Sequence, residues 1–164
     1  MTATIRRIGR PGDLGWVVQA HGEVYAREFG WDTSFEALVA RIVADWAGQH
    51  DDAREAAWIA EQEGERVGCV FCVREDDDTA RLRILLVDPR ARGQRLGARL
   101  VRACLDFART AGYRRMVLWT NHPLAAARAI YLAEGFRLVA EEPHDSYGVH
   151  LIGQTYELEL APAS

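Results

Sequence analysis

A short segment between residues 90 and 97 carries the residue types best suited to binding an anion. It follows an apolar run, residues 82–87, that is typical of a buried strand, and it precedes an amphipathic helix. The segment holds three arginines and two glycines: Arg90, Arg92, Arg95, Gly93 and Gly97. A glycine loop between a strand and a helix start directs several backbone N–H groups at one point, where they bind phosphate. Arginines at a helix start are disfavoured by the helix dipole unless an anion binds there. The pattern predicts a phosphate site, and its alternative is a solvated arginine-rich turn.

The same segment resembles motif A of the GNAT N-acetyltransferases, Gln/Arg-x-x-Gly-x-Gly/Ala. Arg92 and Gly97 match the two ends of the motif, and Arg95 stands where the middle glycine is expected. Residues 118–136 resemble the next segment of the family, a strand followed by a helix that holds a Tyr and ends in Gly-Phe. The order of segments is also similar to the acetyltransferase half of bacterial proteins that fuse a MarR-type regulator to a GNAT domain. The resemblance implies acetyl-CoA as the acetyl donor.

The resemblance also implies which residues bind this cofactor and act on it. The predicted cofactor-binding residues are Leu86, Val87, Arg92, Gly93, Gln94, Arg95, Leu96, Gly97, Ala98 and Asn121. The backbone of Leu86 and Val87 would pair with the pantetheine arm, and the amide of Asn121 would hold it or merely cap the next helix. We expect Arg95 in the first helical turn, with negative φ and its guanidinium on a cofactor phosphate; the alternative is that its bulk blocks the pyrophosphate. Tyr131 would donate a proton to the leaving thiolate; the alternative is that its side chain only packs in the core.

The acceptor site is less well defined by the sequence. Its predicted residues are Tyr25, Arg83, Trp119 and Tyr147. Arg81 and Arg83 stand where some relatives place Glu, so an arginine that faces the acceptor would favour a substrate carboxylate; the alternative is an arginine that faces solvent. The general base stays open among Glu23, His144, Tyr147, His150 and water.

The periodicity of apolar residues predicts the elements that position these groups. Strands are predicted over 4–8, 56–61, 66–74, 82–87, 114–120, 136–141 and 155–160. Helices are predicted over 13–29, from an N-cap at Ser34 to the loop at 49–55, from Leu96 to Gly112, and from Pro123 to Gly135. A long loop, 142–153, is expected between the last two strands. We therefore expect one α/β domain over residues 1–164, a GNAT-type twisted mixed β-sheet of about six to seven strands flanked by four α-helices.

The composition argues against several other classes of protein. All 20 basic residues are Arg, so no lysine is present for a Schiff base or a P-loop. No H-E-x-x-H or G-x-S-x-G motif occurs. The net charge of −4 disfavours nucleic-acid binding, and no apolar run approaches the ~20 residues of a membrane span. The cysteines, Cys69, Cys72 and Cys104, are predicted to be buried packing residues. We expect a cytoplasmic protein with no metal, nucleic-acid or membrane partner. The sequence leaves its oligomeric state open, and a homodimer is one possibility.

The predicted function is N-acetyl transfer from acetyl-CoA to a primary amine of a small molecule, one that bears a carboxylate. Two alternatives stay open: a non-catalytic acyl-CoA-binding regulatory module, and an acetyltransferase that acts on a protein amine.

Overall fold

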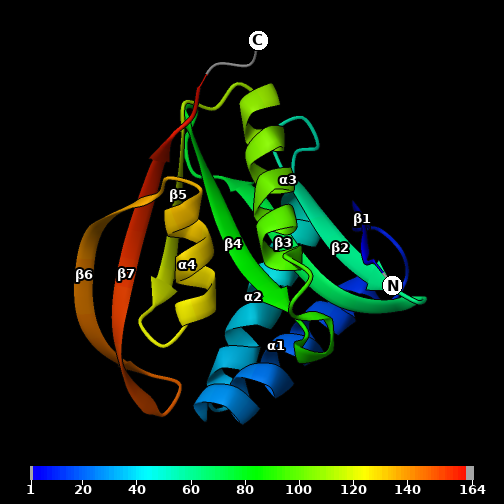
Figure 1. The fold of residues 1–164 in the computed structure, drawn as a ribbon, viewed down its shortest axis with the longest axis vertical. Helices are drawn as coiled ribbons and strands as arrows, with labels where there is room; N and C mark the ends of the chain where they lie inside the picture. Colours follow the sequence, from blue (N-terminus) through cyan, green and yellow to red (C-terminus); the bar gives the residue numbers. More distant parts are fainter. Residues whose placement is uncertain (1, 162–164) are drawn as a thin grey trace.

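The computed structural model describes residues 2–161, which form one mixed β-sheet with helices on both faces (Figure 1). The strands are β1 (Thr4–Arg7), β2 (Ala56–Gln62), β3 (Glu65–Arg74), β4 (Thr79–Val87), β5 (Arg115–Asn121), β6 (Arg137–Ser146) and β7 (Val149–Glu159). The helices are α1 (Asp13–Phe29), α2 (Thr33–Gln49), α3 (Leu96–Thr110) and α4 (Ala125–Ala133), with a short 3-10 turn at Pro89–Ala91. The strand order is β1-β2-β3-β4-β5-β7-β6, and only the β4–β5 pair is parallel. The predicted fold class is confirmed.

Two apolar cores lie on the two faces of this sheet. α1 and α2 pack on one face, against side chains that include Ile59 and Phe71. α3 and α4 pack on the other face, against side chains that include Trp58. Cys69 and Cys72 belong to different cores, because residues three apart on a strand face opposite sides. Both thiols are free and buried, as predicted.

The sheet splits between its two parallel strands. β4 and β5 pair only at Thr79–Arg115, Ala80–Met116 and Arg81–Val117, and they then diverge (Figure 1). Ile84 adds to the split with a φ of 44, at a register shift in the β3–β4 pairing. Such a bulge bends a strand and disrupts its ladder. The second half of β4 therefore keeps one edge free of any neighbouring strand.

A buried carboxylate ties the first elements together. Asp13, at the start of α1, is fully buried and accepts bonds from Arg6 Nη1 and Nη2 at 2.8 Å and from Arg66 Nε at 2.8 Å. The backbone N–H groups of Gly9 and Arg10 donate to the same carboxylate at 2.9 and 2.8 Å. Burial opposes ionisation, but these bonds outweigh it and hold the pKa of Asp13 well below its usual range. Asp13 thus anchors α1, one wall of the site described below.

The end of the chain differs from the prediction. Residues 142–153 are not a loop, because β6 and β7 form a long hairpin that turns at Tyr147 and Gly148. These two residues have φ 56 and 80, as in a type I′ turn. β6 is an edge strand and is exposed along almost all of its length, so its sequence lacks the apolar alternation that marks a strand. Pro143 is tolerated because an edge strand has one side without a partner.

Three predicted boundaries are also corrected. β4 begins three residues earlier than the apolar run, because Thr79 and Ala80 pair with β5. The N-cap of α2 is Asp32, whose Oδ1 accepts a hydrogen bond from the Ser34 N–H at 2.9 Å. Pro123 precedes α4, which begins at Ala125. Within residues 2–161, the helices are too short or too polar to cross a membrane.

Candidate active site

Two adjoining cavities open beside the split in the sheet. The large cavity, of about 820 Å³, lies between the carboxyl end of α1, the segment after β4, and helices α3 and α4. The small cavity, of about 350 Å³, lies between α1, α2, β4 and β5. Both are lined by Tyr25, Leu85, Leu124 and Ala127, so they meet at these residues. A molecule in one cavity can therefore contact a molecule in the other.

The segment after β4 forms one wall of the large cavity. Gly93 has a φ of 90, a left-handed backbone that glycine adopts without strain. α3 begins at Leu96, so the free N–H groups of its first turn lie at this wall. Gly97 lets α4 approach α3, because a Cβ there would lie 2.6 Å from the Ile130 Cδ1. The wall therefore combines backbone donors with the positive end of a helix, the arrangement that binds phosphate.

Arg95 is the N-cap residue of α3, with φ 57 and ψ 25 in the left-handed region. The prediction of a first-turn residue with negative φ is wrong, because the chain turns from loop into helix at this residue. The conformation costs a non-glycine residue about 1–2 kcal/mol, and this cost accounts for the glycine expected here in the family motif. The Arg95 side chain is exposed, lines the large cavity and forms no ion pair within residues 2–161.

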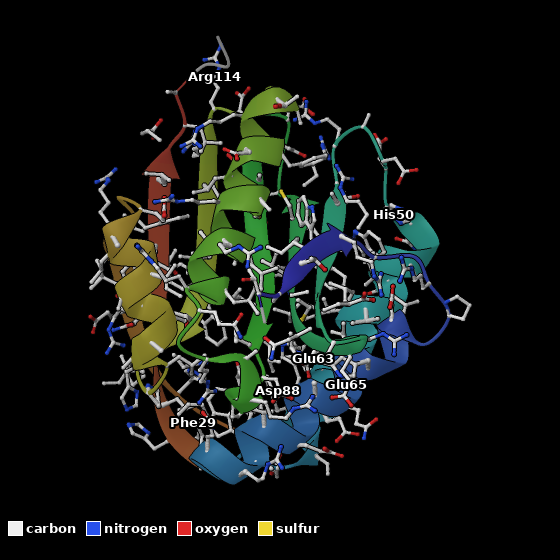
Figure 2. The ribbon with its side chains drawn as sticks, turned by 45° about the vertical axis from the view of Figure 1, so that its right-hand side comes forward. Phe29, His50, Glu63, Glu65, Asp88 and Arg114 are labelled. Carbon is white, nitrogen blue, oxygen red and sulfur yellow. The ribbon has the colours of Figure 1, made fainter. Side chains whose placement is uncertain are left out.

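The other two arginines of the segment are neutralised by carboxylates. Arg92 Nη1 lies 2.6 Å from Oε1 of Glu28 on α1, and both residues line the large cavity. Arg90 pairs with Asp88, directly after β4, and with Glu65, at the start of β3; both carboxylate residues are labelled in Figure 2. Of the three arginines predicted to bind an anion, one is thus free in this structure, and it is the one that replaces the motif glycine.

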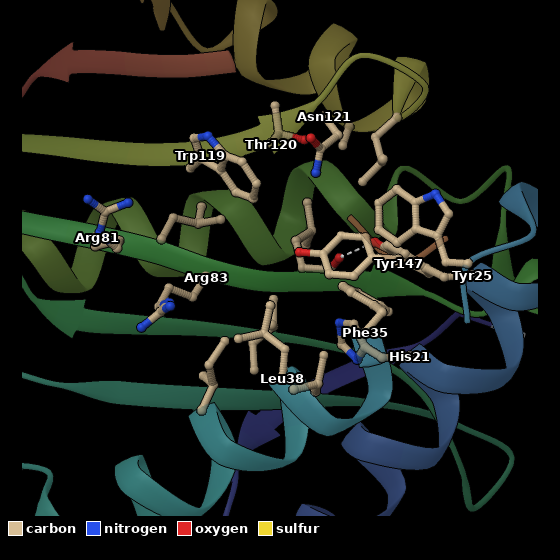
Figure 3. A pocket seen from close by; sticks show the side chains of 18 of the residues that line it. His21, Tyr25, Phe35, Leu38, Arg81, Arg83, Trp119, Thr120, Asn121 and Tyr147 are labelled. Atoms are coloured by element: carbon tan, nitrogen blue, oxygen red, sulfur yellow. Dashed lines mark hydrogen bonds between the residues drawn. The ribbon is translucent and has the colours of Figure 1, made fainter. Parts of the chain in front are cut away.

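The structure places most predicted cofactor residues on the large cavity: Leu86, Val87, Arg92, Gly93, Arg95, Leu96, Gly97 and Ala98. The side chains of the other two predicted residues lie elsewhere, and their part in cofactor binding stays a prediction. The Gln94 side chain turns away from the cavity, because it accepts the Ala3 N–H at 3.2 Å and donates to Gln62. Asn121 lines the small cavity instead, where its Oδ1 accepts a hydrogen bond from His144 Nε2 at 2.7 Å. Its amide nitrogen is then free to donate, and it points into the small cavity (Figure 3).

Tyr131 projects from α4 into the small cavity, close to the residues that line both cavities. Its side chain is buried, and the residue lines the small cavity one turn after Ala127, which lines both. Burial, with smaller effects from Tyr25 and Cys104, raises the pKa of Tyr131 well above its ordinary value. The hydroxyl therefore stays protonated, and it has no hydrogen-bond partner among the described residues. The hydroxyl therefore carries a proton that it can donate, although the raised pKa makes it a weaker acid than an exposed tyrosine.

The small cavity combines aromatic walls with two arginines (Figure 3). Tyr25 stacks on Phe35 with ring centroids 4.9 Å apart, and Trp31 lies 4.9 Å from Tyr147. Arg81, Arg83 and Trp119 line the opposite end, as Figure 3 shows. The structure thus brings the four predicted acceptor residues, Tyr25, Arg83, Trp119 and Tyr147, to one cavity.

The two arginines of this cavity differ in their partners. Arg81 Nε is bound to Glu75 Oε2 at 2.7 Å. Arg83 has no ion pair within residues 2–161, and the carboxylates of Glu75 and Asp45 act on it only at longer range. Burial, followed by the charge of Arg81, lowers the pKa of Arg83, which means that its charge is incompletely compensated. Arg83 is therefore the cation available to a ligand.

The candidate bases from the sequence do not face the cavities, apart from Tyr147. Glu23 is exposed and accepts a bond from Gln19 at 3.0 Å, and His150 is exposed beside Asp145. His144 uses both ring nitrogens, Nε2 toward Asn121 and Nδ1 toward Ser146 Oγ at 2.9 Å. These side chains are placed by the β6–β7 hairpin and by the solvent side of α1, which the sequence alone did not reveal.

His21 is a residue of the small cavity that the sequence reasoning missed. It is buried, and its Nδ1 lies 2.8 Å from the Val17 carbonyl oxygen, so Nδ1 carries the hydrogen. Its Nε2 has no partner among the described residues. Burial, opposed by the Val17 bond, lowers the pKa of His21 to about 4, so the ring is neutral at pH 7. The helical spacing of Val17, His21 and Val24 was the available signal, since it places His21 on the buried stripe of α1.

Comparison with known proteins identifies the family. The sequence profile of the acetyltransferase (GNAT) family matches residues 18–136. The N-acetylaspartate synthetase of Danio rerio is 39% identical over 85 residues, which are 51% of this chain and 30% of that protein. Human N-acetyltransferase 8B is 40% identical over 85 residues, which are 49% of this chain and 37% of that protein. The matched region thus spans 30% and 37% of the length of these curated relatives.

The fold has solved counterparts. A putative acetyltransferase from Salmonella typhimurium, solved with its cofactor acetyl-CoA, superposes with a TM-score of 0.77. It is 19% identical, and the match covers 100% of this chain and 97% of that one. The profile match over most of the chain shows that this protein belongs to the GNAT acetyltransferase family.

Proposed function

We propose that this chain transfers an acetyl group from acetyl-CoA to the primary amine of a small molecule that also carries a carboxylate. The observation that carries this proposal is the meeting of the two cavities beside Tyr131, with a phosphate-type loop on the large one and a free arginine on the small one. The N-acetylaspartate synthetase relatives support a small amine as the acceptor.

The chemistry of the large cavity supports acetyl-CoA as the donor. The backbone of Gly93, the free N–H groups of α3 and the Arg95 guanidinium would hold its pyrophosphate. The edge of β4 at Leu86 and Val87 faces a gap in the sheet, so its backbone would pair with the amides of the pantetheine arm. When bound there, acetyl-CoA supplies a thioester that a neutral amine can attack.

The residues around the junction would then act on the reacting atoms. A free backbone N–H of β4 would hold the thioester oxygen, and the cavity walls would hold the amine against the carbonyl carbon. The Tyr131 hydroxyl would give its proton to the sulfur as the C–S bond breaks, and the amine would lose its proton to water. Arg83 would bind the acceptor carboxylate in a bidentate pair, which its free guanidinium is shaped to form.

The test is release of free thiol from acetyl-CoA by the purified chain with a panel of amino acids and their methyl esters. We expect the free acids to react and the esters to lose most of the activity, because an ester removes the partner of Arg83. Esters that react as well as the acids would remove the carboxylate from the proposal. Tight acetyl-CoA binding without release for any amine would instead support the regulatory module. The homodimer and the similarity to regulator-fused domains stay predictions.

A further inference from the structure

The small cavity presents one available positive charge in a mostly apolar enclosure. Among its described lining residues, only Arg81 and Arg83 are charged, and Arg81 is already bound to Glu75. The cavity can therefore neutralise one carboxylate of a ligand. A second carboxylate would meet no second free cation among these residues and would lose much of its hydration, which is unfavourable.

The wall formed by α2 is apolar, and part of it stays accessible to solvent. Phe35, Leu38, Val39 and Ile42 follow the spacing that places them on one helix face, and all four line the cavity. Leu38 and Ile42 are only half-buried, although they point inward. On the β5 side, Trp119 keeps 40% of its surface exposed. An apolar group of the acceptor would remove this surface from water, which is the main source of affinity in such pockets.

The position of Arg83 suits an acceptor that carries a carboxylate as well as an amine. Arg83 and Leu85 line the same cavity, and Leu85 also lines the large one. The Arg83 side chain lies toward the end of the small cavity opposite Tyr25 (Figure 3). An amino acid can place its amine at the junction and its carboxylate toward Arg83, and its remaining substituent is left to face the apolar wall.

We propose that the acceptor is an amino acid with one carboxylate and a large apolar side chain, and that dicarboxylates such as aspartate are rejected. The proposal rests on the proposed acetyl transfer and names the substrate class of its acceptor cavity. The proposed acceptor therefore differs from aspartate, the acceptor that the name of the N-acetylaspartate synthetase relatives suggests.

The test compares kcat/KM for leucine, phenylalanine, aspartate, asparagine and the β-methyl ester of aspartate, measured by thiol release. Leucine and aspartate are similar in size, so their ratio reports the second charge. We expect leucine and phenylalanine to exceed aspartate by about a hundredfold or more, because the second carboxylate finds no second free cation in the cavity. The β-methyl ester should recover much of this loss because it removes that charge.

A pair of variants tests the location of the selectivity. Leu38→Arg adds a second cation to the cavity wall and should raise the aspartate-to-leucine ratio by at least about tenfold. Ala37→Arg adds the same charge at an exposed neighbouring position of α2 that does not line the cavity, and it should leave the ratio unchanged.

The outcomes separate the two proposals. Acetylation of aspartate as fast as leucine would overturn the inference and leave the acetyltransferase proposal standing. An equal shift of the ratio in both variants would also overturn it, because long-range charge would then set the preference. Acetyl-CoA binding without thiol release for any amine would overturn the proposed function, and this inference with it.

Discussion

Removing the Arg95 side chain should weaken acetyl-CoA binding without changing the backbone strain at this position. Arg95 has a left-handed backbone, and alanine carries the same Cβ, so Arg95→Ala keeps that strain while it deletes the guanidinium. A charge-assisted bond to phosphate contributes about 1.5–3 kcal/mol, and an exposed side chain should contribute near the lower end of this range. A loss of about 1.4 kcal/mol corresponds to a tenfold rise in Kd.

Calorimetric titration with acetyl-CoA at low and high salt measures this effect. The loss should be larger at low salt, because screening weakens the pair with phosphate. Arg109→Ala, near the far end of α3, is the matched control, since it removes the same charge away from both cavities. Arg95→Gly should be about 1 kcal/mol more stable than Arg95→Ala in urea unfolding, because glycine relieves the strain. Tighter cofactor binding in Arg95→Ala would refute the argument, because it would show that the side chain obstructs the loop.

Three further predictions concern buried groups. Tyr131→Phe should lower kcat by roughly ten- to a thousandfold with little change in acetyl-CoA Kd, and a wild-type kcat would remove its role as proton donor. Asp13→Asn should reduce the free energy of unfolding by about 3–5 kcal/mol in urea titrations, since Arg6 and Arg66 lose their shared charge partner. A change below about 1 kcal/mol would contradict the anchoring role of Asp13. The pKa of His21 is depressed to about 4 in the folded chain, so the unfolded chain takes up the proton first as pH falls below 6.5. The free energy of unfolding should therefore drop by about 2 kcal/mol from pH 7 to pH 5 on account of His21. His21→Leu should lack this part of the drop. An unchanged pH dependence in the variant would show that the ring is not buried in the folded chain.

Much of the fold could be predicted because its signals are local. The bounds of α1 follow from apolar spacing and from Gly30, whose φ of 73 ends the helix. The strand, glycine loop and helix around Gly93 are likewise encoded within about 30 consecutive residues, since each step depends on neighbours along the chain. The resemblance of residues 118–136 to the family segment is also local, and it is the basis on which Tyr131 was predicted.

The site itself depended on contacts between distant residues. Asn121 and His144 lie 23 residues apart, and only the pairing of β6 with β7 and of β7 with β5 brings them together. The hairpin was missed because an exposed edge strand needs no apolar alternation: backbone pairing holds it, and pairing leaves no mark on residue type.

The sequence by itself determined the order of elements, the phosphate-type loop and the family, because these follow from residue types at short spacings. The tertiary structure alone decided which arginine is free. Arg92 meets Glu28 across 64 positions of the chain, and Arg81 meets Glu75 at the β3–β4 turn, whereas Arg95 and Arg83 form no ion pair among the described residues. Whether a charge is available to a ligand depends on which carboxylates the fold brings within about 4 Å, and no local pattern contains that distance.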